Sequence, residues 1–350
     1  MGDTLYMPPV LGTGGGASTW AALALTGLTD GGVADNSAVI QAALDAADAA
    51  GGGTVILPPG DYGIATVLTM YETVRLWGQG RYVTRLTALT ANMTMLTYTS
   101  ATLPPYPPQR WLADIELQGD ATADVGFYCE YAAYMSLDGV TIRNCLVTGF
   151  HGVFVLVCQF RQCLFDDCFW GVNLEPDGGN FCNLNTFESC SWGNNAGWGL
   201  LIQGADQNHL ISCDFESNGD NAHNTVGDPS GAIQIFGHGL ATTCASLKIT
   251  NGWFELNKGF AGIYLFQAGS VSLDAVLNSN PDAGCEFGIY SNGTVVSLKN
   301  SVVGTLTAHN TADVKLINAP ASLTRQETYC TLIDPAPPTG AIADLGFNSP

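Results

Sequence analysis

Ile142-Arg-Asn-Cys145 is the first of six similar four-residue segments between Val140 and Asn280. Each segment opens with a large apolar residue and ends in Cys or Asn, and successive segments begin 23, 22, 28, 39 and 23 residues apart. The other five are Phe165-Asp-Asp-Cys168, Phe187-Glu-Ser-Cys190, Phe215-Glu-Ser-Asn218, Phe254-Glu-Leu-Asn257 and Leu277-Asn-Ser-Asn280. A short unit that recurs at such a period is typical of a solenoid, in which each turn buries its apolar face against its neighbours.

The repeated unit predicts β-strands. It is too short for a pair of helices, and its apolar residues alternate as in a strand, for example at Val140 and Ile142. A second strand per coil is indicated by Gly152-Val153, Gly171-Val172, Gly199-Leu200, Gly231-Ala232, Gly262-Ile263 and Gly288-Ile289. We therefore predict an all-β solenoid of parallel strands with coils about 4.8 Å apart. The Cys and Asn that end each unit are interpreted as structural residues at turns.

The composition fits one rigid body and excludes several classes of partner. Of the 350 residues, 46% are hydrophobic and 12% are charged, and 42 are Gly, which suits many short strands and tight turns. The chain has 31 acidic and 11 basic residues, so its formal net charge is −20. We expect no nucleic-acid partner, because phosphate binding needs a basic stripe. We also expect no membrane partner, since the charge repels anionic lipids and no long apolar run is present.

The cysteines and the start of the chain bear on where the protein works. Eleven Cys are present without a CxxC or Cys/His spacing typical of a metal site, so we expect free thiols and folding in a reducing cytosol. The sequence from Met1 to Pro9 has no basic region followed by an apolar run, so no secretory signal is expected.

The N-terminal part predicts a lead-in followed by a capping helix. Residues 1–30 are rich in Gly and Ala and are interpreted as a lead-in or attachment segment. A helix near 37–49 is expected after the capping residues Asp35, Asn36 and Ser37, and Gly51-Gly-Gly53 ends it. Its apolar face would comprise Val39, Ile40, Ala43, Leu44 and Ala47. A helix of this kind could cover the open end of a β-solenoid.

The stretch around this helix resembles a known family. Asp35-Asn-Ser-Ala-Val-Ile-Gln-Ala-Ala-Leu-Asp-Ala-Ala, Gly51-Gly-Gly-Thr-Val-Ile-Leu-Pro-Pro-Gly-Asp-Tyr62 and Leu76-Trp-Gly-Gln-Gly80 are similar to the opening of the pectate-lyase-like superfamily. The resemblance is greatest to the branch that includes phage tailspike depolymerases. It implies a right-handed single-stranded parallel β-helix, a polysaccharide-related role and a homotrimer.

The resulting domain plan has three parts. Residues 1–30 form the lead-in, 31–305 the β-helix with its capping helix, and 306–350 a C-terminal cap or subunit-contact segment. Residues 101–111 contain four prolines, which cannot join a β-ladder, so a rim loop is expected there.

Carboxylates on the outer face are the candidate catalytic groups. If Phe165, Phe187, Phe215 and Phe254 point inward, the residues after them point outward, which predicts one column of Asp166, Glu188, Glu216 and Glu255. We assign Glu216 and Glu255 as acid and base or nucleophile, because carboxylate pairs at such spacings perform glycoside hydrolysis. Glu188 and Asp214 are expected to assist them. Trp253 and Asp166 are expected to bind the substrate, since an aromatic plane can stack on a sugar ring.

Other interpretations of this column stay open. The acids could be a solvated polar face, or they could hold Ca²⁺, although no cofactor is required by the sequence. A lyase that uses an arginine as its base is less supported, because Arg143 and Arg161 are the only arginines between positions 111 and 324.

These features together predict a function and two alternatives. We expect a phage tailspike-like or other tail-surface protein, located in the virion beside other tail proteins, that binds a host polysaccharide and hydrolyses it if the acids are catalytic. A non-enzymatic structural β-helix of a phage tail or capsid fibre is the first alternative. A secreted bacterial polysaccharide hydrolase or lyase is the second.

Overall fold

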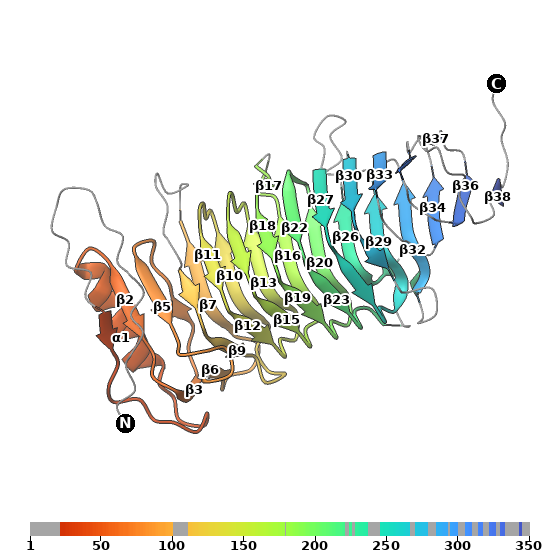
Figure 1. Cartoon of the computed structure of the whole chain (residues 1–350). Helices are drawn as coiled ribbons and strands as arrows, with labels where there is room; N and C mark the ends of the chain where they lie inside the picture. Colours follow the sequence, from red (N-terminus) through yellow and green to blue (C-terminus); the bar gives the residue numbers. More distant parts are fainter. Residues whose placement is uncertain are drawn as a thin grey trace, which may run out of the picture.

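The computed structural model describes most of the chain as an elongated stack of coils. The described residues are 22–100, 111–178, 180–220, 224–225, 228–236, 246–266, 270–278, 285–292, 295–299, 305–309, 314–317, 322–326, 330–332 and 343–344. Strands of successive coils lie side by side along three faces (Figure 1). Every ladder between the strands of these faces is parallel, which confirms the predicted parallel β-helix.

We name the three faces sheets A, B and C. Sheet A comprises β1 (Ala22–Ala24), β2 (Gly53–Ile56), β5 (Val74–Trp77), β8 (Leu112–Ala113), β11 (Ser136–Asp138), β14 (Gln159–Arg161), β18 (Thr186–Glu188), β22 (Asn208–Ile211), β27 (Ser246–Thr250), β30 (Ser270–Asp274), β33 (Val295–Lys299), β35 (Val314–Ile317) and β37 (Cys330–Leu332). Sheet B comprises β3 (Gly60–Ile64), β6 (Thr84–Ala88), β9 (Glu116–Gln118), β12 (Thr141–Arg143), β15 (Leu164–Asp166), β19 (Ser191–Gly193), β23 (Asp214–Glu216), β28 (Trp253–Glu255) and β31 (Leu277–Asn278).

Sheet C has the longest strands. It comprises β4 (Leu68–Thr69), β7 (Thr94–Thr99), β10 (Val125–Glu130), β13 (Thr148–Val153), β16 (Trp170–Glu175), β20 (Trp198–Gln203), β26 (Gly231–Phe236), β29 (Gly259–Phe266), β32 (Cys285–Asn292), β34 (Thr305–His309), β36 (Ser322–Gln326) and β38 (Ala343–Asp344). Two small ladders join β17 (Cys182–Asn183) to β21 (Ala205–Asp206) and β24 (Asn224–Thr225) to β25 (Asp228–Pro229).

Seven consecutive coils, from the one that contains β8 and β9 to the one that contains β30 and β31, pass from sheet A to sheet B through a tight left-handed turn. The turns contain one residue per coil with φ between 49° and 63°: Asp114, Gly139, Gln162, Ser189, Ser212, Asn251 and Ala275. Polar residues and Gly tolerate this conformation best, since their side chains add little strain there. The turn lets two short strands with the same alternation follow each other closely. The sequence analysis therefore merged strands of the two sheets into one repeat.

Stacked aromatic rings fill the core, and their contacts show which of the repeated residues belong to sheet A and which to sheet B. Phe165 and Trp192 stack inside sheet B, and Trp192 and Phe215 follow with ring centroids 4.4 Å apart. Phe187 instead belongs to sheet A, where it stacks on Phe160 at 4.3 Å. The prediction that Phe187 repeats Phe165 is therefore wrong, and Trp192 takes that place. Register also pairs Leu277 with Trp253, so Leu277 does not repeat Phe254.

Buried asparagines connect successive coils between sheets B and C. Asn218 donates from Nδ2 to Oδ1 of Asn257 at 2.9 Å and to the carbonyl of Trp192 at 2.9 Å. Asn195 donates to Oδ1 of Asn218 at 2.8 Å, and none of the three amides is exposed. These bonds satisfy backbone groups that the turns leave without ladder partners. They confirm the structural role predicted for Asn218 and Asn257.

The predicted glycine column is confirmed at four of its six positions. Residues that follow Gly171, Gly199, Gly262 and Gly288 share one register in sheet C: Val172, Leu200, Ile263 and Ile289. In the other two coils this register contains Phe150 and Ile233, so Gly149 and Ala232 replace the expected Gly152 and Gly231. A Cβ on Gly171 would lie 2.6 Å from the carbonyl oxygen of Gly199, which explains the glycines.

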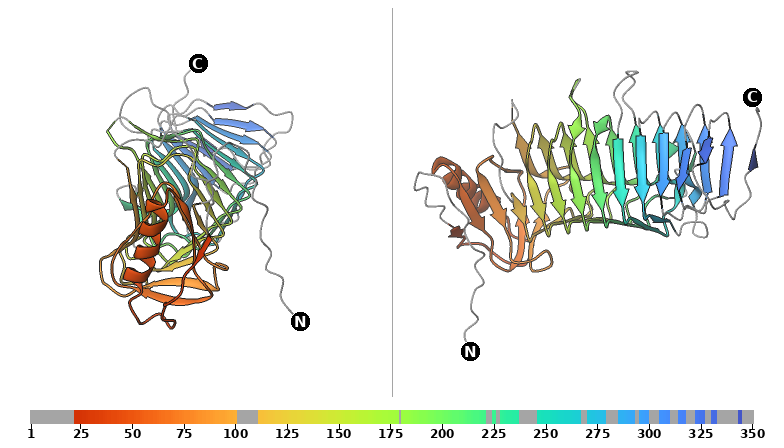
Figure 2. Two further views of the ribbon diagram at one scale, coloured as in Figure 1. Left: turned by 90° about the vertical axis from the view of Figure 1, so that its left-hand side faces the viewer. Right: turned by 45° about the horizontal axis from the view of Figure 1, so that its top comes forward.

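The capping helix α1 (Ser37–Ala49) lies across the N-terminal end of the stack (Figure 2). It buries Ile40, Ala43 and Leu44 and packs on β2, β4 and β5. Val39 was predicted on this face but is exposed, because the buried side is narrower than the apolar pattern suggested. After the helix and β2, the segment that contains Tyr62 and Leu68 forms two strands, β3 in sheet B and β4 in sheet C.

Several expected features lie outside the described residues. They are residues 1–21 of the lead-in, the Pro-rich loop at 101–110 and Asn280. Beyond residue 305, strands β35 to β38 continue sheets A and C. No helix in the described part of the chain is long and apolar enough to cross a membrane. The eight cysteines whose side chains are described are buried free thiols.

Candidate functional site

The expected column of four carboxylates is only partly formed. Glu216 and Glu255 are register partners on adjacent strands β23 and β28 of sheet B. Asp166 lies in the same column, but Gly193 separates it from Glu216. Glu188 is in β18 of sheet A, so the prediction that it joins this column is wrong. The column therefore holds three of the four predicted acids.

Asp214 completes an acidic cluster with Glu216 and Glu255. It lies two residues before Glu216 on β23, so both side chains leave the same outer face of sheet B. Burial raises the pKa of Asp214, and the nearby charges of Glu216 and Glu255 raise it further. Glu216 is exposed, whereas Asp214 is half-buried. The three acids thus differ in environment although they lie on two adjacent strands.

Trp253 provides an aromatic surface beside these acids. It is the register partner of Asp214, and its side chain is 45% exposed. Its indole nitrogen donates a hydrogen bond to Oε2 of Glu255 at 3.0 Å. This bond orients the exposed ring, which places an apolar plane next to carboxylates as sugar-binding sites commonly do.

Asp166 has a different environment, two strands away from Glu216. Its Oδ2 lies 3.4 Å from Nη2 of Arg143, and Asn194 donates to its Oδ1 at 3.0 Å. Burial raises the pKa of Asp166, which opposes the stabilising effect of Asn194 and Arg143 on the charged form. Arg143 also bonds Asp167 at 3.0 Å. Asp166 is thus held in a local ion-pair network, and its predicted role in binding substrate stays a prediction.

Glu188 faces away from the acidic cluster. Its Oε2 lies 3.4 Å from Nε of Arg161, and both side chains are about half exposed, at 51% and 47%. An exposed pair of this kind contributes little to stability. Glu188 lies on sheet A, so this geometry gives it no direct role beside Glu216.

The sequence analysis missed a polar network on the outer face of sheet C. His151 Nε2 lies 3.1 Å from Oε2 of Glu175. Asn173 donates to Oε1 of Glu175 at 2.6 Å, and Gln203 donates to the same atom at 3.0 Å. These bonds and His151 lower the pKa of Glu175. The carboxylate is therefore held ionised and oriented by three side chains.

Tyr128 extends this network toward the N-terminal end. Its ring packs edge-on against His151 at 5.3 Å, and its hydroxyl donates to Oε2 of Glu130 at 3.2 Å. Burial and the charge of Glu130 raise the pKa of Tyr128 to about 12. Tyr128 and His151 are 23 residues apart, which is the coil period. That spacing was the signal that could have placed both on one face.

Aromatic side chains adjoin the sheet C network toward the C-terminal end. Trp198 stacks on Tyr264 at 6.2 Å, and Trp170 and Phe236 pack against the same cluster. The short hairpin of β24 and β25 contacts β29 of sheet C.

Metal ligation has no support among the described residues. No group of three or more His, Cys, Asp or Glu side chains there is arranged to hold a metal ion. The calcium site considered from the sequence stays a prediction.

The fold and these two polar faces define a class: right-handed parallel β-helix proteins with polar residues in ladders on their outer faces. The family model for the right handed beta helix region matches residues 125–303, and this chain belongs to that family. A second model, described as rhamnogalacturonase A/epimerase, pectate lyase-like, matches residues 25–118. The pectate-lyase-like resemblance seen around Asp35–Gly80 is thereby confirmed.

A short segment resembles a curated protein. The chain is 50% identical over 56 residues to mannuronan C5-epimerase AlgE6 of Azotobacter vinelandii, a match that covers 14% of this chain and 6% of that protein. The chain therefore spans only a small part of that relative's length.

Solved structures share the fold at low identity. The A-module of mannuronan C-5 epimerase AlgE4 from Azotobacter vinelandii gives a TM-score of 0.66 at 16% identity, covering 92% of this chain and 98% of that one. A GH87 alpha-1,3-glucanase of Streptomyces thermodiastaticus gives 0.54 at 13% identity, covering 97% and 70%. Tailspike protein 2 of an Escherichia coli O157:H7 bacteriophage gives 0.53 at 13% identity, covering 84% and 41%.

Proposed function

We propose that this protein binds a polysaccharide on the outer face of sheet B and hydrolyses it there. The observation that carries the proposal is Asp214, whose pKa is raised by burial and by Glu216 and Glu255 beside it. A carboxyl group with a raised pKa keeps its proton to higher pH, as the general acid of a glycoside hydrolase must. Trp253 supplies the plane on which a sugar ring stacks.

The environments of the three acids suggest a division of roles. The sequence pattern assigned Glu216 and Glu255 as acid and base or nucleophile with Asp214 assisting. The raised pKa of Asp214 makes it the better proton donor to the leaving oxygen. Glu216 or Glu255 then acts as the base that activates water. Asp166 and Trp253 would contact the sugar chain on either side.

Strand geometry favours inversion at the cleaved carbon. The Cα atoms of Asp214 and Glu216, two residues apart on one strand, are about 6.6 Å apart. The Cα atom of Glu255, diagonal to Asp214 across one strand spacing, is about 8 Å away. Carboxyl groups that keep these backbone spacings would lie in the range of about 6.5 to 9.5 Å that leaves room for a water in inverting enzymes.

Release of reducing ends tests this proposal. Surface polysaccharides of candidate host bacteria are incubated with the wild type and with Asp214→Asn, Glu216→Gln and Glu255→Gln, with Glu188→Gln as a matched control. We expect hydrolysis by the wild type and the control, and a loss of at least about 100-fold in Asp214→Asn. Proton NMR of the first product should show the inverted anomer. Full activity in Asp214→Asn would overturn the assignment of Asp214 as the proton donor. Addition of EDTA tests separately whether Ca²⁺ contributes to activity.

A second candidate function places proton transfer on sheet C. The observation that favours it is the His151–Glu175 pair with Tyr128 beside it, since an oriented His can take a proton from a substrate. The matching structures include a mannuronan C-5 epimerase module, and we consider epimerisation or elimination on a uronate chain. Loss of such activity in His151→Gln, but not in His209→Gln, would support this candidate over hydrolysis on sheet B.

The setting we propose is the tail of a phage, in a homotrimer with other tail proteins. A tailspike among the structures that share the fold supports it. The alternatives are a structural β-helix of a tail or capsid fibre and a secreted bacterial hydrolase or lyase. Light scattering gives the oligomeric state. A trimer that binds and degrades no host polysaccharide would favour the structural alternative.

A further inference from the structure

The connection between β5 and β6 differs from the tight turns of the coils that follow it. It takes six residues, Gly78 to Val83, where the next seven coils turn at a single left-handed residue. The loop does not project freely, because Gly80 donates from its backbone nitrogen to the carbonyl of Asp114 at 2.9 Å. Internal bonds from Val83 and Thr84 to the carbonyl of Gly80 fix its shape.

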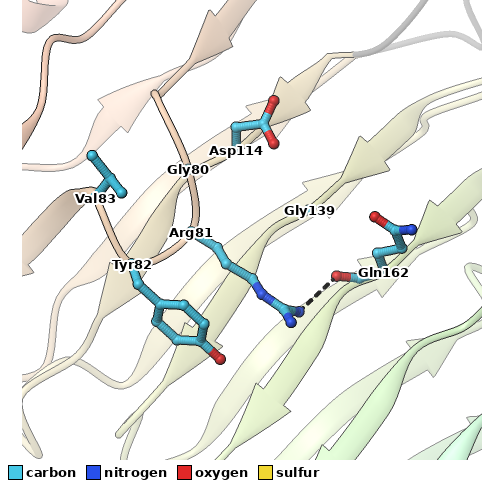
Figure 3. A pocket seen from close by; sticks show the side chains of 7 residues that line it. All are labelled: Gly80, Arg81, Tyr82, Val83, Asp114, Gly139 and Gln162. Atoms are coloured by element: carbon cyan, nitrogen blue, oxygen red, sulfur yellow. Dashed lines mark hydrogen bonds between the residues drawn. The ribbon is translucent and has the colours of Figure 1, made fainter.

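Arg81 extends this loop across three coils. Its Nη1 donates to the carbonyl oxygen of Gln162 at 3.0 Å, although the two residues are 81 positions apart (Figure 3). Its guanidinium also lies over the Tyr82 ring, 5.2 Å from the centroid. A guanidinium has five N–H donors, so the bond to Gln162 leaves others for a ligand. The loop is thus held over the corner by specific bonds.

The loop and the turns beneath it border an open cleft of about 330 Å³. It is lined by Gly80, Arg81, Tyr82, Val83, Asp114, Gly139 and Gln162. In Figure 3 the guanidinium of Arg81 lies between Tyr82 and Gln162, and Asp114 is drawn above these three residues. A cleft of this volume is within the range of small-ligand sites.

Gly139 keeps the floor of the cleft open. Its φ is 63°, the left-handed conformation that Asp114 and Gln162 also adopt at the neighbouring turns, and an added Cβ would lie 2.9 Å from Oδ1 of Asp114. The Asp114 carboxylate therefore occupies the space that a larger residue at 139 would fill. Tyr82 is 62% exposed and Val83 49%, so an apolar rim adjoins these polar groups.

We propose that this cleft binds one sugar residue of the same polysaccharide, as a subsite remote from the cleavage point. Asp114 accepts hydrogen bonds from sugar hydroxyls, Arg81 and Gln162 donate to sugar oxygens, and the Tyr82 ring packs on a C–H face. The subsite rests on the proposed function, since it requires that the chain bind a polysaccharide.

The position of the cleft sets the length of ligand that it detects. The turns at Asp114 and Gln162 precede strands β9 and β15, which lie five and three strand spacings in sheet B from β28, the strand that carries Trp253. These separations are about 24 Å and 14 Å along the helix axis. Only oligosaccharides long enough to span this distance could contact Trp253 and the cleft together.

Titration calorimetry with an oligosaccharide series of increasing length tests the subsite. The full chain is compared with Tyr82→Ala, Arg81→Gln and Trp253→Ala, and Tyr134→Ala serves as a control, because Tyr134 is another exposed tyrosine, 46% exposed. We expect Tyr82→Ala to bind long oligosaccharides about five- to tenfold more weakly and short ones as the wild type does. Trp253→Ala should weaken binding of both.

Each outcome of this titration is decisive. If Tyr82→Ala and Arg81→Gln bind long oligosaccharides as tightly as the wild type does, and Trp253→Ala binds them more weakly, the subsite is rejected and the proposed function stands. No binding by the wild type at any length would reject both. Because Arg81 anchors the loop, the thermal unfolding of Arg81→Gln is measured as well. If Arg81→Gln unfolds at a lower temperature than the wild type, the result is decided by Tyr82→Ala, which leaves the bond between Arg81 and Gln162 in place.

Discussion

Phe215 and Phe254 stack inside the helix with ring centroids 4.9 Å apart and only 8° between their planes. The same two strands carry Glu216 and Glu255 on their outer faces as register partners. Because side chains alternate along a strand, the inner stack fixes the positions of the outer acids. The core and the candidate site are therefore two sides of one ladder.

Phe215→Ala should destabilise the protein and disturb the site together. Phe215 is completely buried, and loss of such a ring costs about 3 to 5 kcal/mol. Denaturant unfolding monitored by circular dichroism measures this loss. Leu146→Ala is the control, because Leu146 is 48% exposed and should cost far less. Equal stability of the two variants would contradict the stacking account.

Asn218→Ala should cost more than its single side chain suggests. The Asn218 amide donates to Asn257 and to the carbonyl of Trp192 and accepts from Asn195, all in the buried interior. Each buried partner left without a bond costs about 1 to 3 kcal/mol. Gln159→Ala, at an exposed amide in β14, is the matched control. Unfolding midpoints of the two variants that differ little would argue against a structural ladder.

Asp214→Asn should stabilise the fold at neutral pH. Burial and the charges of Glu216 and Glu255 raise the pKa of folded Asp214 above the ordinary value of 3.8, so the folded state binds more protons than the unfolded state as pH rises past that value. Stability then falls with rising pH through this window, and Asn removes the loss. At pH 7 the variant should melt at a higher temperature than the wild type, and at pH 3.5 the two melting temperatures should agree. A variant less stable at pH 7 would contradict the raised pKa.

Glu188→Gln should leave both stability and activity nearly unchanged. Glu188 forms an exposed pair with Arg161, which contributes about 0 to 1 kcal/mol. It lies on sheet A, away from Glu216. Thermal melts and reducing-end assays beside Glu216→Gln measure both effects. A loss of activity comparable to that of Glu216→Gln would show that Glu188 does belong to the catalytic site.

The sequence contained enough information for the fold but not for every register. The recurrence of Phe165, Phe215 and Phe254 before Cys or Asn predicted the coils, because a ladder needs an apolar residue inside and a tolerant residue at each turn. Phe187-Glu-Ser-Cys190 has the same sequence pattern, but Phe187 lies in sheet A. Only two residues, Ser189 and Cys190, separate β18 of sheet A from β19 of sheet B, so alternation alone could not assign Phe187 to one of the two sheets.

The site could be predicted in part for the same reason. Asp214, Trp253, Glu216 and Glu255 were placed correctly relative to each other, because adjacent coils carry the same triplet pattern around a buried Phe. The network of His151 and Glu175 was missed, since its members come from strands whose outer residues differ in type from coil to coil. The cleft at Arg81 depends on a loop that spans three coils, which no periodic pattern encodes.

The crystal structure of the Glu216→Gln variant with the shortest host oligosaccharide that binds it would test the central claim most directly. The account predicts a sugar ring stacked on Trp253, with a glycosidic oxygen within hydrogen-bond reach of Asp214. A saccharide bound only elsewhere, with Trp253 and Asp214 contacting solvent alone, would contradict it.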